Sequence, residues 1–292
     1  MKSLFLMMLF CAGAVCAAPA QEVDRIEYAS SLNSMVSVIM NWYGSLIQSN
    51  ELISLSTEES KWHNYRSQYP KAITNIEIES TDLVKLNENN DYQFEIQTII
   101  FNTNSNGVQQ GQKFSERFVF NVPFLDTPTI KTVNREQLEI IISESNKNSN
   151  STYFKARQFS YAWLAYLDGV TTIVDFINDN NWLEKAPYSL KIGSLEVTDS
   201  IASALLKRNQ YLAKGGHLLR SIDVQKNTGL EDNLTLNLII EWQGENASGK
   251  AVIAKIHQEI DIKILKNNSW EVISIKEEHL LPDLKPWQGL LC

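Results

Sequence analysis

Cysteine is scarce in this 292-residue chain, which has three: Cys11, Cys16 and Cys292. The first two fall in residues 1–20, where Lys2 precedes a short apolar run and Ala18 and Ala20 supply the small residues of a signal-peptidase site. We therefore expect a secretory signal that is cleaved after Ala20. The alternative, an uncleaved membrane anchor, needs a longer apolar run. Cleavage leaves Cys292 alone, so no intramolecular disulfide is expected and core packing must stabilise the exported protein.

Basic residues are also in the minority, with 26 Lys and Arg against 34 Asp and Glu and a formal net charge of −8. An acidic chain without basic clusters is not expected to bind nucleic acid or anionic membranes. No second apolar stretch is long enough to span a bilayer, so we expect no stable membrane insertion. The location that fits is the bacterial periplasm or, after secretion, the medium.

Histidine is sparse and scattered, at His63, His217, His257 and His279. No two of these residues have metal-binding spacing and no Cys cluster accompanies them, so a metal site is not expected. The chain also lacks a Gly-rich phosphate loop and a GxSxG elbow, and we expect no cofactor.

What the chain does contain is an internal repeat at a constant offset of 142 residues. Residues 65–122 align without a gap on residues 207–264, so that Tyr69 falls on Tyr211. A constant offset keeps inward side chains inward, because a slip of one residue would turn a strand over. The repeat therefore predicts two copies of one domain.

We place these domains at residues 21–145 and 153–292, joined by an Asn-rich linker at 146–152. Apolar periodicity in the first copy predicts helices at 26–55 and 58–69, strands at 73–86, 92–102, 113–122 and 130–133, and a helix at 135–145. The second copy predicts helices at 154–177 and 198–213, ending at a Gly-Gly pair, and strands at 217–226, 233–244, 249–265 and 269–279. About 12 extra residues lie near 184–197 in this copy.

A long helix, a short helix and a meander of antiparallel strands form an α+β plan. The most recognisable stretch is at residues 240–275, where Glu241-Trp242-Gln243-Gly244 and Gly249-Lys250 lead into an alternating strand and Ser269-Trp270-Glu271-Val272 closes a hairpin. The pattern resembles the nuclear transport factor 2-like superfamily, which includes ketosteroid isomerase, scytalone dehydratase and SnoaL-like cyclases. The resemblance implies two cone-shaped domains in tandem, each with helices on a curled antiparallel sheet. Many members are not enzymes, so it implies no activity.

A polar residue on the apolar, helix-facing side of a strand indicates a pocket in such a fold. Glu116 is the single carboxylate among alternating Phe residues, and Gln258 stands at the matching place between Ile256 and Ile260. We therefore expect Glu116 and Gln258 to line a ligand pocket. Burial would favour the protonated form of Glu116, which suits a general acid or base. The alternative is a position at the rim of the sheet, paired with a Lys or Arg.

Asp168 lies on the first helix expected in the second copy, two residues after Tyr166. Ketosteroid isomerase-like enzymes combine a carboxylate base with a Tyr or acidic oxyanion donor. The resemblance thus implies that Asp168 with Tyr166 or Tyr211 imitates this arrangement, although no complete catalytic set matches residue by residue. The alternative is that Asp168 and Asp175, which share a helical face, are solvated.

Apolar residues also occur on the opposite strand face, at Ile99, Phe101, Val119 and Ile239. Such residues suggest a covered surface, and members of the resembled superfamily often dimerise sheet to sheet. We therefore expect the two copies to meet through these four residues as an internal pseudo-dimer. The alternative is that they are scattered, exposed apolar side chains.

The leading hypothesis from the sequence is an exported, non-enzymatic protein that binds a small apolar ligand or an envelope protein. Two alternatives stay open. The first is an isomerase, dehydratase or cyclase-type enzyme that uses a pocket carboxylate as general acid or base. The second is a structural subunit of an envelope assembly.

Overall fold

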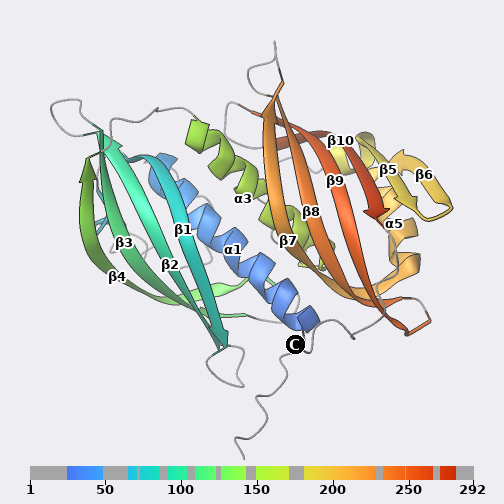
Figure 1. Ribbon diagram of the computed structural model, residues 1–292, viewed down its shortest axis with the longest axis horizontal. Helices are drawn as coiled ribbons and strands as arrows, with labels where there is room; N and C mark the ends of the chain where they lie inside the picture. Colours follow the sequence, from blue (N-terminus) through green and yellow to red (C-terminus); the bar gives the residue numbers. More distant parts are fainter. Residues whose placement is uncertain are drawn as a thin grey trace, which may run out of the picture.

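The computed structural model describes residues 25–48, 65–70, 73–85, 91–103, 109–122, 126–142, 149–170, 181–227, 233–246, 248–265 and 270–280. The predicted signal at 1–20 and Cys292 lie outside these residues. The described part is an α+β structure in which two curved, mainly antiparallel sheets flank a pair of helices (Figure 1). The predicted fold class is therefore confirmed. None of the described helices is long and apolar enough to cross a membrane.

The first sheet is a four-stranded antiparallel meander, in the order β1 (Ile73–Lys85), β2 (Asp91–Thr103), β3 (Gln109–Asn121) and β4 (Thr129–Ile142). Alternate residues of β2, among them Tyr92, Phe94 and Ile96, are buried in its core. The helix predicted at 135–145 is wrong, because residues 135–142 continue β4. Their pairing with β3 overrides a local sequence that favours a helix.

Helix α1 (Arg25–Gln48) packs on the inner face of this sheet. Its apolar residues recur every three or four positions, as predicted, and Trp42 and Tyr43 contact the ring of Phe118 edge-on. A second face of α1 carries small polar residues at a spacing of four: Asn33, Ser37, Asn41 and Ser45. These are buried too, so α1 is covered on both faces.

The second sheet has six strands in the order β6-β5-β10-β9-β8-β7. Their bounds are β5 (Pro187–Ile192), β6 (Leu195–Ser200), β7 (Leu212–Lys226), β8 (Asn233–Asn246), β9 (Ala251–Ile264) and β10 (Trp270–Leu280). The helices of this half are α3 (Ser149–Leu167), α4 (Asn181–Lys185) and α5 (Ile201–Tyr211). Residues 149–152, expected in the linker, begin α3 instead.

Helix α5 is shorter than the predicted 198–213 and ends before the Gly-Gly pair. Those glycines lie inside β7, where Gly215 faces the indole of Trp242 on β8. A Cβ at Gly215 would lie only 2.2 Å from the nearest indole atom. Close packing of an aromatic ring, rather than a helix stop, therefore accounts for this glycine.

The two sheets repeat each other in strand register. Ile96 pairs with Glu116 between β2 and β3, and Leu238 pairs with Gln258 between β8 and β9, at the predicted offset of 142. The extra residues near 184–197 form most of the β5–β6 hairpin, and β5 runs parallel to β10. The insertion therefore covers the β10 edge of the second sheet, whereas no described strand covers the equivalent β4 edge of the first.

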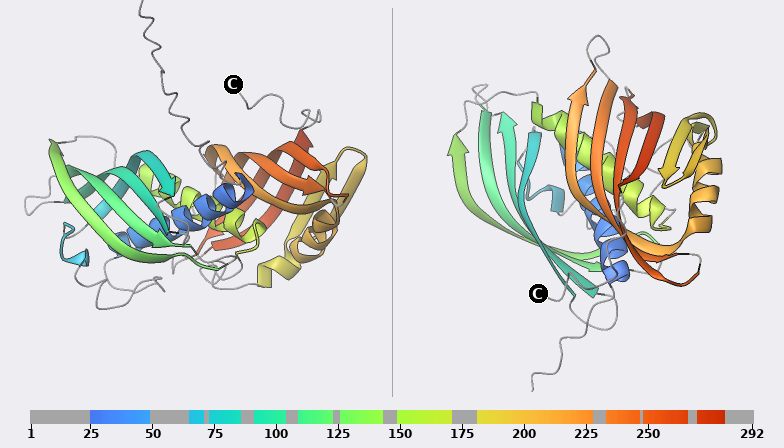
Figure 2. Two further views of the ribbon diagram at one scale, coloured as in Figure 1. Left: turned by 90° about the horizontal axis from the view of Figure 1, so that it is seen from below. Right: turned by 45° about the vertical axis from the view of Figure 1, so that its right-hand side comes forward.

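The two halves meet through helices. Helix α1 contacts α3 and β7, while α3 contacts β1, and both views of Figure 2 show α1 and α3 between the sheets. Asn33 donates to Asp168 and Gln158 donates to Asn41 across this junction. In the described residues the halves are thus not joined by the sheet faces predicted to meet through Ile99, Phe101, Val119 and Ile239. The second buried face of α1 consists of small polar residues, which a pattern of apolar residues does not reveal.

Candidate functional site

Glu116 is fully buried on the helix-facing side of the first sheet. Its carboxylate accepts hydrogen bonds from Tyr43 on α1 at 2.6 Å, from Thr98 on β2 at 2.9 Å and from Tyr69. Burial, then the charge of Glu116, raises the pKa of both tyrosines well above the usual value. The two phenols therefore remain protonated donors, and the carboxylate is surrounded by hydroxyl groups.

Arg135 on β4 is the cation next to this carboxylate. Its Nε lies 3.6 Å from Oε1 of Glu116, and its guanidinium lies between the rings of Tyr69 and Phe114, at 3.8 and 3.4 Å from their centroids. It also donates to the carbonyl of Gln68. Burial lowers the pKa of Arg135, but a guanidinium stays charged across the physiological range. Glu116 thus belongs to a polar cluster that is paired inside the core, not to the exposed rim of the sheet.

Gln258 occupies the equivalent place in the second sheet and is also fully buried. Its Oε1 accepts a hydrogen bond of 2.9 Å from the indole of Trp163 on α3, and its Nε2 donates to Glu277 on β10. The amide therefore links a helix donor to a carboxylate on the neighbouring strand.

Glu277 is the charged centre of the second cluster. It accepts hydrogen bonds from Arg208 on α5 at 2.9 Å, from His279 at 2.7 Å, and from Tyr188 and Gln258. Burial opposes ionisation, but the charge of Arg208 and the bonds from His279 and Tyr188 hold the pKa of Glu277 well below its usual range. Glu277 and Arg208 thus form a buried, fully paired ion pair.

Asp168 is brought to this cluster by the end of α3. Gly169, with φ of +98°, ends the helix; the amides of Gly169 and Val170 bond back to the carbonyls of Tyr166 and Ala165. The carboxylate of Asp168 is buried and accepts from His217 Nδ1 at 2.6 Å and from the His217 amide at 3.1 Å. The interpretation of Asp168 as solvated is therefore wrong.

His217 connects Asp168 to Arg208. Its Nε2 lies 2.7 Å from Nη2 of Arg208, which can only donate, so Nε2 accepts and Nδ1 carries the proton given to Asp168. Asn33 of α1 donates to Asp168 at 2.8 Å and so joins the first half to this chain of contacts. Both ring nitrogens of His217 are engaged, which leaves no free lone pair for proton abstraction.

Two tyrosines were predicted to act with Asp168. Tyr166 packs against another side chain, and the side chain of Tyr211 is not described. Tyr166 stacks on Trp163 with ring centroids 5.8 Å apart, and burial, then Glu184, raises its pKa. The Tyr211 side chain and Asp175 lie outside the described residues. The sequence analysis missed Arg135, Glu277, Arg208 and His217. Arg135 and Glu277 stand 142 residues apart, so the repeat offset carried a signal for them.

No group of His, Cys, Asp and Glu that suits a metal ion occurs among the residues that the structure describes. In the second sheet the side chains of the polar cluster bond to one another, whereas in the first sheet Nε and Nη2 of Arg135 have no hydrogen-bond partner among the described residues. Neither cluster gathers a set of metal-binding side chains in the part of the chain that the structure describes.

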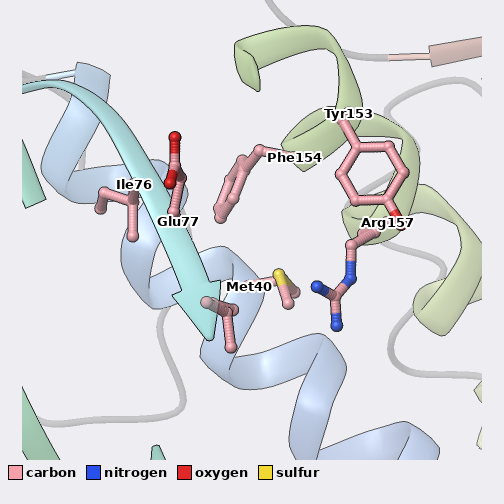
Figure 3. A pocket seen from close by; sticks show the side chains of 7 residues that line it. Met40, Ile76, Glu77, Tyr153, Phe154 and Arg157 are labelled. Carbon is pink, nitrogen blue, oxygen red and sulfur yellow. The ribbon is translucent and has the colours of Figure 1, made fainter. Parts of the chain in front are cut away.

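A separate groove of about 240 Å³ lies where the two halves meet, between α1, β1 and α3. Met40, Ile76, Ile78 and Phe154 supply apolar surface, and Glu77, Tyr153 and Arg157 supply polar atoms. In Figure 3, Met40 and Phe154 lie between Glu77 on β1 and Arg157 on α3. The groove is therefore apolar in its middle and has opposite charges on its two sides.

No protein-family model and no curated protein matches this chain. Solved structures with similarity to part of it include a hexachlorocyclohexane dehydrochlorinase from Novosphingobium barchaimii, at 8% identity and TM-score 0.37 over 46% of this chain and 91% of that one. A putative scytalone dehydratase from Novosphingobium aromaticivorans has 9% identity and TM-score 0.35 over 45% and 87%.

An NTF-2-like protein of unknown function from Silicibacter pomeroyi has 13% identity and TM-score 0.32, over 45% of this chain and 99% of that one. Each match thus spans somewhat less than half of the present chain and nearly all of its own. These are similarities of backbone, and they assign neither a family nor an activity to this chain.

Proposed function

We propose that this is an exported, non-enzymatic protein that binds a small apolar ligand in the groove between its two halves. The observation that carries the proposal is the groove itself, with four apolar side chains contributed by α1, β1 and α3. Small-molecule sites are concave, mostly apolar and frequent at domain junctions. With 240 Å³, the groove holds the equivalent of about eight water molecules.

The buried clusters argue against acid–base catalysis. A general base needs a free lone pair within reach of the substrate. Glu116 and Glu277 are fully buried and surrounded by donors, while Nε2 of His217 faces a guanidinium that cannot take up a proton. These groups stabilise the two cores, and the groove is left as the place where a ligand meets the protein.

The proposal is tested with N-phenyl-1-naphthylamine, an uncharged apolar probe that fluoresces when it leaves water. The full chain is expected to bind the probe saturably. Replacing Ile78→Trp fills the groove with a larger side chain and should abolish binding. Tyr153 lies at an exposed position on the rim of the groove, so Tyr153→Ala should weaken binding only slightly and should leave the core unchanged.

The matched control is Ile239→Trp, because Ile239 is also half-buried in a strand but is not part of the groove. Circular dichroism checks that each variant is folded. Absence of saturable binding, or binding that survives in Ile78→Trp, would overturn the proposal.

A further inference from the structure

One cation lies on the α3 side of the groove. The guanidinium of Arg157 is half-buried beside the apolar middle, with Tyr153 one turn before it and Tyr161 one turn after it on α3. The ring of Tyr161 is 6.0 Å from the guanidinium. Among the described residues, no carboxylate forms an ion pair with Arg157, so its charge is available to a ligand.

The opposite side of the groove carries a negative charge. Glu77 on β1 contributes to the lining and already has an interaction with another part of the chain. Its carboxylate disfavours an anion on the β1 side, while Arg157 attracts one on the α3 side. The two charges therefore impose one orientation on any ligand with a charged end.

The side chains between the two charges are apolar and form the floor of the groove, while polar atoms supply about half of its exposed lining. Met40 and Phe154 are nearly fully buried, and Ile76 and Ile78 extend this surface along β1. A saturated chain or an aromatic ring fits such a lining, whereas a polar body would lose hydrogen bonds to water without replacement. The volume of 240 Å³ is just below the usual range for drug-sized ligands.

We infer that the ligand of this groove is an amphipathic anion: a medium-chain or aromatic carboxylate. Its carboxylate pairs with Arg157, and its apolar part lies over Met40 and Phe154. Guanidinium is suited to this role because it binds carboxylate oxygens through two parallel N–H groups. The inference rests on the proposed function and adds the chemical class of the ligand.

The protein as a whole has a net charge of −8, so its overall electrostatic field repels anions. Selection of an anionic ligand therefore depends on a local cation and not on the general field of the molecule. Removing the charge of Arg157 should remove the preference for anions without removing the apolar part of the affinity.

The test compares three ligands that share one apolar chain: octanoate, 1-octanol and octylamine. Each is titrated against the full chain carrying N-phenyl-1-naphthylamine, and displacement of the probe gives the affinity. Octanoate should bind about fivefold more tightly than 1-octanol, as for a partly exposed ion pair, and octylamine should bind least well. Octanoate and 1-octanol should be equal in Arg157→Gln, whereas Arg157→Lys should retain part of the preference.

The control is Arg117→Gln, which removes an exposed arginine that pairs with Glu95 on the first sheet. It should leave the preference for octanoate unchanged. Equal affinities of octanoate and 1-octanol in the unaltered protein, or a preference that survives in Arg157→Gln, would overturn the inference. The proposed function would still stand if Ile78→Trp abolished binding of the probe, and it would fall if that variant bound the probe normally.

Discussion

The two sheets place different charges at matching positions. Where the first sheet has Glu116 opposite Arg135, the second has Gln258 opposite Glu277. A cation reaches the carboxylate in both halves, from strand β4 in the first and from helix α5 in the second. In each half a buried carboxylate therefore lies next to a buried guanidinium, but the guanidinium comes from different places in the repeat.

The edge strands account for the difference. In the first sheet β4 is the last strand, and most of its side chains from Asn134 to Ile140 are exposed. In the second sheet the β5–β6 hairpin pairs with β10 and covers the equivalent strand. This cover allows Glu277 to be fully buried, and a buried carboxylate needs a close cation, which Arg208 supplies.

One feature is common to both clusters. The first helix of each half donates a hydrogen bond to the equivalent strand position, from the phenol of Tyr43 to Glu116 and from the indole of Trp163 to Gln258. Both halves thus keep a polar acceptor beneath an aromatic donor. The acceptor is a carboxylate in the first half and an uncharged amide in the second. Packing of helix on sheet requires the hydrogen bond, and the ion pair is arranged around it.

The largest expected effect is that of Glu277→Gln. The amide keeps the shape of the side chain but leaves Arg208 without its direct counter-ion in the core, since the carboxylate of Asp168 reaches Arg208 only through His217. We expect the free energy of unfolding to fall by about 3–5 kcal/mol, measured by urea denaturation followed by circular dichroism. The control Glu259→Gln breaks an exposed pair with Lys276 and should change stability by less than about 1 kcal/mol. Equal effects of the two substitutions would show that burial does not distinguish these pairs.

Acid should reduce the difference in unfolding free energy between the unaltered protein and Glu277→Gln. Because the pKa of Glu277 is depressed in the folded state, its ionisation stabilises the protein above the unfolded pKa, about 4.3. That stabilisation is lost as pH falls through the lower folded pKa. The gap in unfolding free energy should therefore be constant near neutral pH and shrink below about pH 4. A gap that does not change with pH would mean that the charge of Glu277 contributes nothing.

Glu116→Gln should cost less, about 1.5–3 kcal/mol. Its partners are three neutral hydroxyl groups; Tyr43 and Thr98, which share Oε2, can also donate to an amide oxygen there, and the Tyr69 hydroxyl can accept from the amide nitrogen. Arg135 keeps the carbonyl of Gln68 and two aromatic rings as neighbours, so its charge is not left isolated. The measurement is the same denaturation series. A loss as large as that of Glu277→Gln would show that Arg135 depends on Glu116 more than the 3.6 Å separation indicates.

The strands and their register were predictable from the sequence, because alternation has a period of two and a shared offset fixes the faces. The same reasoning placed Glu116 and Gln258 on the inner faces. It missed Glu277, although Ile275, Glu277 and His279 also alternate inward. The run Lys276-Glu277-Glu278 has the composition of an exposed strand end, and only the added hairpin buries its middle residue.

Contacts between distant elements could not be predicted. Nothing in the local pattern indicates that Asp168 meets His217, since their contact depends on how α3 ends and where β7 begins. The helix predicted at 135–145 failed for a related reason, because Gln137, Leu138 and Glu139 favour a helix until β3 offers a partner strand. The groove is also a product of assembly, since three elements from two halves line it.

The smallest expected effect concerns the contact that joins the two halves. Asn33→Ala removes the hydrogen bonds of Nδ2 to Asp168 at 2.8 Å and to the carbonyl of His217 at 2.6 Å. It also removes Oδ1, a buried oxygen with no hydrogen-bond partner among the described residues, and this offsets part of the loss. We expect a net cost of about 1 kcal/mol in unfolding free energy.

Asn33→Asp should cost more, because it adds a second carboxylate beside Asp168. Ser45→Ala is the control, since among the described residues Ser45 bonds to the carbonyl of Asn41 in its own helix, and its loss should be nearly neutral. If Asn33→Ala and Asn33→Asp had the same effect as this control, Asn33 would not link the α1 helix to the Asp168–His217 pair. The junction would then depend on packing of the helices and on the hydrogen bond from Gln158 to Asn41.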